Sequence, residues 1–199
     1  KIVAKSNDFI KISLNRIHPR FLKNEIQNVI ITSKNAVDSL TTNYSANELQ
    51  FKNIYCVGRR TKRLVENKIG KVKHTEKNAQ KLAEYLVDYI EGTDVTYFCS
   101  DIRLDALPTI LADNNINVNE VEAYQTKYDS FEVDETVESV MFYSPSTVDS
   151  FVQKNKPEVI AFCIGETTAK QARKHFKDVR VAKVPTVESV IELVNEYYV

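Results

Sequence analysis

The same pattern occurs twice in the sequence, as "VIITSKNAVDSL" at residues 29–40 and as "VMFYSPSTVDSF" at residues 140–151. Each stretch opens with an apolar run, reaches a serine (Ser33 or Ser144), and closes with Val-Asp-Ser and a large apolar residue. A short apolar run that ends in a polar turn and continues with helical spacing is typical of a buried strand followed by a helix. The chain is therefore predicted to contain two strand–helix units of one design.

The repeat extends beyond these stretches. "YCVGRRTKRL" carries Gly58 and Thr61, and "FCIGETTAKQ" carries Gly165 and Thr168. Repetition at so long a period predicts two similar domains rather than a solenoid, and alternating strands and helices predict α/β domains with parallel sheets. The expected strands are 28–33, 52–58, 94–100, 139–145, 158–165 and 179–185, and the expected helices are 35–43, 61–68, 76–92, 103–115, 146–154, 167–176 and 187–198.

Two stretches do not fit a strand–helix unit. Residues 2–14 and 119–133 alternate between apolar and polar side chains, which indicates extended structure. Each lies beside a boundary of the repeat, so we expect both to link the two domains.

The composition is that of an ordinary soluble domain, with 43% hydrophobic and 27% charged residues. Lys+Arg and Asp+Glu number 27 each, which argues against a general nucleic-acid binder. There is no apolar run near the ~20 residues of a membrane span and no secretory signal pattern. Cys56, Cys99 and Cys163 each lie in an apolar run, which indicates buried, reduced thiols and a cytoplasmic protein.

The predicted strand ends carry small residues, chiefly Ser33, Gly58, Ser100, Ser144 and Gly165. In α/β sheets ligands bind beyond the carboxyl ends of the strands, where the next helix directs free N–H groups that favour an anion. Helix capping alone explains any one of these serines, but it explains the duplication with paired glycines less well.

Basic residues follow the strand ends of the first half, which predicts a cationic surface for carboxylates there; the alternative is a solvated helix face, which we prefer for Arg63. The residues concerned are Lys34, Arg59, Arg60, Arg63 and Arg103.

No common nucleotide, metalloprotease or serine-hydrolase motif is present. His18, His74 and His175 lack ligand spacing, so no metal site is predicted.

Seven segments together resemble the uroporphyrinogen-III synthase family in order and spacing, from Val29 to the C-terminus. They are "VIITSKNAVDSL", "CVGRRTKRL", "CSDIRLDALP", "VEAYQTKY", "FYSPSTVDSF", "AFCIGETTAKQA" and "VPTVESVIELV". The resemblance implies two similar parallel-sheet α/β domains joined by two extended linker strands, with the active site in the cleft between them. It implies an inserted domain at 15–120, linker strands at 1–14 and 121–133, and a second domain at 134–199. Family members usually begin with a further strand–helix unit, which the sequence does not show ahead of Lys1; we expect that the unit either was removed or is lacking in this member.

The resemblance also implies a function. The family cyclises hydroxymethylbilane, a linear tetrapyrrole, to uroporphyrinogen III in heme biosynthesis. Water is lost, a spiro intermediate forms and ring D is inverted. This is a lyase reaction without a cofactor, and we expect a cytoplasmic monomer.

The resemblance places Tyr124 where it would assist departure of the hydroxyl; the alternative is a tyrosine that packs between domains. The residues expected to bind substrate are Ser33, Lys34, Gly58, Arg59, Thr61, Ser100, Arg103, Ser144, Ser146, Gly165, Thr167 and Thr168. Lys34 and Arg59 are included on charge alone, and Ser100 and Arg103 are included because they lie in the matching segment "CSDIRLDALP".

Two other functions remain open at this stage. A non-catalytic, two-lobed protein that binds a small anion would show the same strand-end turns. A flavodoxin-like signalling domain would need acidic strand ends, so we rank it last.

Overall fold

The computed structural model describes residues 2–198. The chain divides after residue 11 and after residue 126 into two compact units. Ile12–Thr126 form one, which we call the inserted unit. The segments before and after it form the other, which we call the terminal unit.

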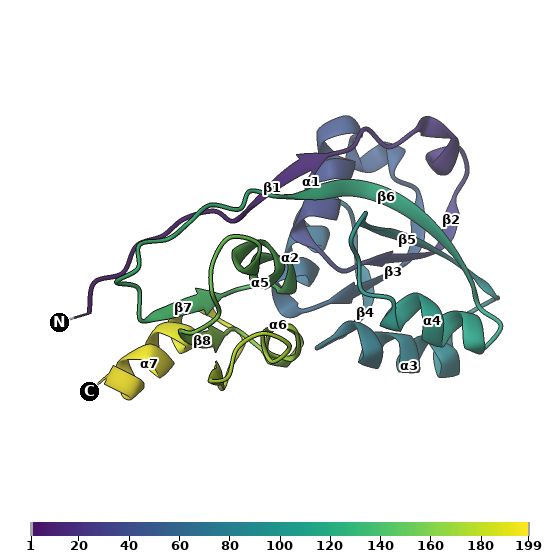
Figure 1. Cartoon of the computed structure of the whole chain (residues 1–199). Helices are drawn as coiled ribbons and strands as arrows, with labels where there is room; N and C mark the ends of the chain where they lie inside the picture. The colour runs from purple at the N-terminus through teal and green to yellow at the C-terminus, as the bar shows by residue number, and fades with distance from the viewer. Residues whose placement is uncertain (1, 199) are drawn as a thin grey trace. The chain divides into compact units, whose positions relative to one another are not determined.

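The inserted unit is built on a six-stranded sheet in the order β1-β6-β5-β2-β3-β4. Strands β2 to β6 run parallel. At the edge, β1 lies alongside β6 (Figure 1) and runs antiparallel to it, with the Asn15 N–H donating to the Ala123 carbonyl. The strands are β1 Ile10–Leu14, β2 Ile26–Ile31, β3 Phe51–Val57, β4 Val72–Glu76, β5 Asp94–Ser100 and β6 Asn117–Tyr128.

Helices cover both faces of this sheet, which explains why its central strands carry runs of consecutive apolar residues. Consecutive residues Ile30 and Ile31 of β2 are both fully buried, but in different hydrophobic clusters. The first cluster lies under α1 Lys34–Asn43 and α2 Arg59–Lys68, and the second under α3 Ala79–Tyr89 and α4 Ala106–Asp113. Two short 3-10 helices, η1 Pro19–Leu22 and η2 Ala46–Glu48, complete the unit.

The terminal unit has a three-stranded parallel sheet in the order β7-β8-β9. Its core is a cluster of phenylalanine rings around Phe151, to which Phe9 contributes from the N-terminal segment. Phe9 also stacks on Phe131 at 4.3 Å between ring centroids. The elements are β7 Ser139–Phe142, α5 Pro145–Val152, β8 Ile160–Cys163, α6 Glu166–Ala172, β9 Val179–Val181 and α7 Val187–Tyr198.

The predicted fold class, α/β with parallel sheets in two parts, is confirmed. Strand β4 was missed, because "VKHTE" is short and largely polar, as edge strands often are. The expected linker 121–133 begins inside β6, which pairs with β5 from Asn117 onward. Among residues 2–198, no helix is both long and apolar enough to span a bilayer.

Candidate functional site

The strand order of the inserted unit changes direction between β2 and β5. From β2 the sheet continues to β3 and β4 on one side, and on the other side to β5 and β6. In open parallel sheets a crevice forms at such a switch point, outside the carboxyl ends of the strands, and ligands bind there. Ser33 follows β2 and Ser100 ends β5, so these two predicted site residues flank the switch point.

A β-bulge brings Tyr124 to the same place. Cys99 of β5 pairs with Glu122 of β6, but the next residue, Ser100, pairs with Tyr124, so Ala123 is an extra residue in β6. Ala123 and Tyr124 consequently both pack against the same hydrophobic cluster, although neighbours in a regular strand face opposite ways. The bulge thus places Tyr124 opposite Ser100.

The phenol of Tyr124 is only partly exposed, and its surroundings are hydroxylated. Burial raises its pKa, while the nearby hydroxyls of Ser33 and Ser100 act in the opposite direction and offset part of the rise. A phenol with a raised pKa stays protonated at neutral pH, so Tyr124 can donate a hydrogen bond but is a weak acid. The structure therefore brings together three of the predicted site residues.

The two predicted glycines differ in conformation. Gly58, the N-cap of α2, has φ +79°, a conformation that only glycine adopts without strain, and its N–H donates to the Glu76 carbonyl at 2.8 Å. Gly165, the N-cap of α6, has φ −172°, which is extended backbone open to any residue. The two glycines therefore share a place in the repeat but not a backbone conformation.

Gly58→Ala should therefore destabilise the inserted unit by about 1–3 kcal/mol, because the added Cβ meets backbone strain rather than a clash. Gly165→Ala is the matched control. Its Cβ would lie 4.0 Å from Pro185 Cβ, an ordinary contact, so we expect stability to be unchanged or slightly raised. Urea unfolding of both variants measures the difference, and equal losses would contradict it.

Two of the predicted cations are already paired. Lys34 forms an ion pair with Asp38 at 2.7 Å. Arg103 donates to both carboxylate oxygens of Glu120 and, at 2.6 Å, to Asp105. The guanidinium of Arg103 is thus hydrogen-bonded to two carboxylates, and the charge of Lys34 is likewise paired with a carboxylate. Arg59, in contrast, is exposed in the first turn of α2 and has no ion pair among residues 2–198.

The terminal unit presents a comparable but smaller set of predicted site residues with hydroxyl groups, at the starts of α5 and α6. Ser144 caps α5, accepting from the Thr147 N–H, and its hydroxyl lies 3.0 Å from that of Ser146. Thr167 and Thr168 lie in the first turn of α6, with Thr167 exposed and Thr168 buried. Thr61 is buried at the matching place in α2, so both threonines contribute to packing as well as to the strand-end surface.

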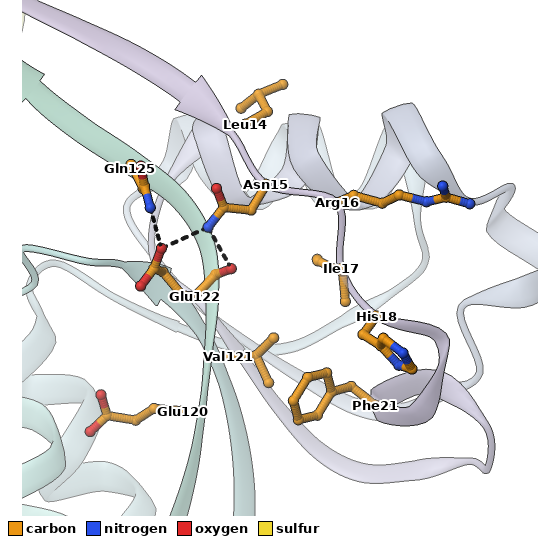
Figure 2. A pocket seen from close by; sticks show the side chains of 10 residues that line it. All are labelled: Leu14, Asn15, Arg16, Ile17, His18, Phe21, Glu120, Val121, Glu122 and Gln125. Atoms are coloured by element: carbon orange, nitrogen blue, oxygen red, sulfur yellow. Dashed lines mark hydrogen bonds between the residues drawn. The ribbon is translucent and has the colours of Figure 1, made fainter.

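One cavity of the inserted unit lies elsewhere. It measures about 600 Å³ and is lined by residues beside β1 and β6, including Glu120 and Glu122, but by none of the predicted site residues (Figure 2). Its lining carries the carboxylates of Glu120 and Glu122 beside the cation Arg16, so it has no cationic excess to favour an anion. We therefore place the candidate site at the switch point and not in this cavity.

The cysteines do not supply a nucleophile. Cys56, Cys99 and Cys163 are buried and free, and burial raises their pKa values to about 12, 11 and 11. They are neutral thiols at neutral pH. Among residues 2–198, no group of three His, Cys, Asp or Glu side chains is arranged to hold a metal ion.

The sequence profile described as "Uroporphyrinogen-III synthase HemD" matches residues 1–192. The chain belongs to this family. As a member of the uroporphyrinogen-III synthase family, it is similar to "Porphyrin biosynthesis protein HemD" from Ruminiclostridium josui, with 31% identity over 107 residues. That match covers 48% of this chain, and the chain spans only 21% of that relative's length.

Solved structures of the family share the fold. A uroporphyrinogen-III synthetase from Helicobacter pylori gives a TM-score of 0.71 at 20% identity, covering 95% of this chain and 91% of that one. A mutant uroporphyrinogen III synthase from the extremely thermophilic bacterium Thermus thermophilus gives 0.69 at 15% identity, covering 96% and 87%. These likenesses support the fold, and the family profile supports the predicted family.

Proposed function

We propose that this chain is a uroporphyrinogen-III synthase, a lyase that converts hydroxymethylbilane to uroporphyrinogen III. The observation that carries the proposal is the phenol of Tyr124 beside the hydroxyls of Ser33 and Ser100 at the switch point of a family member. We further propose that the protein acts as a cytoplasmic monomer without a cofactor.

The residues would act mainly by holding the substrate. Hydroxymethylbilane closes without help to the type I isomer, so the enzyme has to control which carbon of ring D attacks. Free N–H groups in the first turns of α1 and α2, with the hydroxyls of Ser33 and Thr61, are suited to bind carboxylate arms. In the terminal unit the first turns of α5 and α6 offer the same kind of donors.

Tyr124 would act at the step that starts the reaction. The terminal hydroxyl leaves with a proton as water, and the remaining azafulvene is attacked by the substituted carbon of ring D to give the spiro intermediate. That ring then reopens and closes at the other carbon. A neutral phenol stabilises the departing oxygen by donating a hydrogen bond to it. The phenol keeps its proton, because the pyrrole N–H of the ring that becomes the azafulvene supplies the proton that is lost with the water.

The test is an isomer assay with this chain as it stands. Freshly prepared hydroxymethylbilane is incubated with and without the protein, the products are oxidised to porphyrins, and types I and III are separated. We expect type III to predominate with the protein and type I without it. Type I alone in both samples would overturn the proposal, and bound substrate in that case would favour a non-catalytic, two-lobed small-anion binding protein.

A further inference from the structure

The bulge that aims Tyr124 is held by hydrogen bonds from outside β6. A bulge leaves one residue out of the regular ladder, so its backbone groups need other partners. Here the carbonyls of Glu122, Ala123 and Tyr124 all accept hydrogen bonds, and the donors come from two residues, Asn15 and Asp101.

Asn15 holds the side of the bulge that faces β1. Its backbone N–H donates to the Ala123 carbonyl at 2.9 Å, and its side-chain amide donates to the Glu122 carbonyl at 3.1 Å and to the Glu122 carboxylate at 2.8 Å. Figure 2 shows this amide directed at Glu122, which Gln125 also contacts. Asn15 therefore binds the extra residue, Ala123, and the residue before it.

The same asparagine is hydrogen-bonded to α1, the helix whose N-cap is Ser33. The Asn15 carbonyl accepts from the hydroxyl of Ser39 at 2.9 Å, and Ser39 is fully buried in α1. Because Ser33 is the N-cap of α1, one residue couples the bulge to the helix whose first residues face the phenol.

Asp101 holds the side of the bulge that faces β5. Its N–H donates to the Tyr124 carbonyl at 3.2 Å, and its carboxylate accepts from the Thr126 N–H at 2.9 Å and from the Ser100 hydroxyl at 2.8 Å. Asp101 thus fixes the backbone on both sides of Gln125 and orients the hydroxyl that lies opposite Tyr124.

We propose that Asn15 and Asp101 are positioning residues that hold the bulge in β6 and so aim Tyr124 at Ser33 and Ser100. The catalytic role of this orientation of Tyr124 rests on the proposed function. Without the side-chain hydrogen bonds of Asn15 and Asp101, the pairing of β5 and β6 can return to a regular register. That register would set Ser100 opposite Ala123 and turn the side chain of Tyr124 toward the other face of the sheet.

The kinetic test combines Asn15→Ala and Asp101→Ala with Tyr124→Phe. We expect each alanine variant to lower kcat by roughly 3- to 30-fold, with KM changed less than about twofold, because an aimed hydrogen bond in the transition state is lost. In the Tyr124→Phe background the same alanine changes should cost less than about twofold, since the group they position is gone. Asp101→Asn, which keeps an acceptor oxygen, should retain most of the activity.

Asn119→Ala is the matched control, the same change on an exposed residue of β6 outside the bulge, and it should leave kcat unchanged. Losses that simply add in the Tyr124→Phe background would overturn the positioning role, because they would indicate general destabilisation.

A second readout does not depend on activity. The ultraviolet titration of Tyr124 is obtained as the difference between each protein and its Tyr124→Phe counterpart. The parent phenol should titrate above the ordinary tyrosine range, and in Asn15→Ala or Asp101→Ala its pKa should move toward the ordinary value as the ring is exposed. An unchanged titration in both folded variants would overturn the positioning role. If the parent makes only the type I isomer, the proposed function fails while this titration still decides the proposal about the bulge.

Discussion

Tyr124→Phe is expected to lower kcat for formation of uroporphyrinogen III by about 10- to 100-fold without abolishing it. The phenol is held at the switch point beside Ser33 and Ser100, where it would donate a hydrogen bond to the leaving hydroxyl. Loss of one such bond to a developing charge is worth about 1.5–3 kcal/mol, which sets the size of the effect. The substrate remains bound through its carboxylates, so KM should change little. Stopped assays that separate the type I and type III isomers measure both constants.

Tyr44→Phe is the control for this change. Tyr44 follows α1 and donates its hydroxyl hydrogen to the Ile17 carbonyl at 2.6 Å, far along the helix from Ser33. Its loss should reduce stability by about 1 kcal/mol and leave kcat unaltered. If Tyr124→Phe keeps the parental rate, the tyrosine packs in the site but has no part in the chemistry.

The pH dependence follows from the direction of the pKa shift. Burial raises the pKa of Tyr124, so the phenol is protonated at every pH below the ordinary tyrosine range near 10. A phenol that has to be protonated loses its role only as pH rises through this raised value. The Tyr124 contribution, measured as the ratio of parental to Tyr124→Phe rates, should therefore stay constant from neutral pH to about pH 9.

Phe151→Ala is expected to destabilise the terminal unit by about 3–5 kcal/mol, because it empties the centre of a small core. The ring is 1% exposed and contacts three other rings, with centroids 5.6 Å from Phe9, 5.6 Å from Phe142 and 5.9 Å from Phe176. In a unit of this size each kcal/mol shifts Tm by roughly 4–8 °C, so the transition of the terminal unit should fall by more than about 10 °C.

Phe98→Ala is the matched variant in the inserted unit, where the ring is fully buried in β5. Scanning calorimetry should show that each alanine lowers a different transition, because each unit has its own hydrophobic clusters. A single transition that moves equally in both variants would indicate that the two units unfold as one.

The ion pairs of two predicted substrate-binding cations show how much of their surroundings the local sequence displays. Lys34 and Arg103 were predicted to bind substrate from their nearness to strand ends. Lys34 pairs with Asp38, a partner one helical turn away that the sequence already displays. Arg103 pairs with Glu120, which belongs to a neighbouring strand and is brought close only by the pairing of β5 with β6.

The sequence by itself determined the strand–turn–helix units, the buried strands and the serines that cap α1 and α5, because alternation, burial and capping depend on residues a few positions apart. The tertiary structure alone decided the conformation of Gly58, the switch point between β2 and β5, and the bulge that turns Tyr124 toward Ser100. The reason is physical: strand register is set by hydrogen bonds between distant segments, here from Asn15 and Asp101 to β6, and no local pattern encodes which residue faces which.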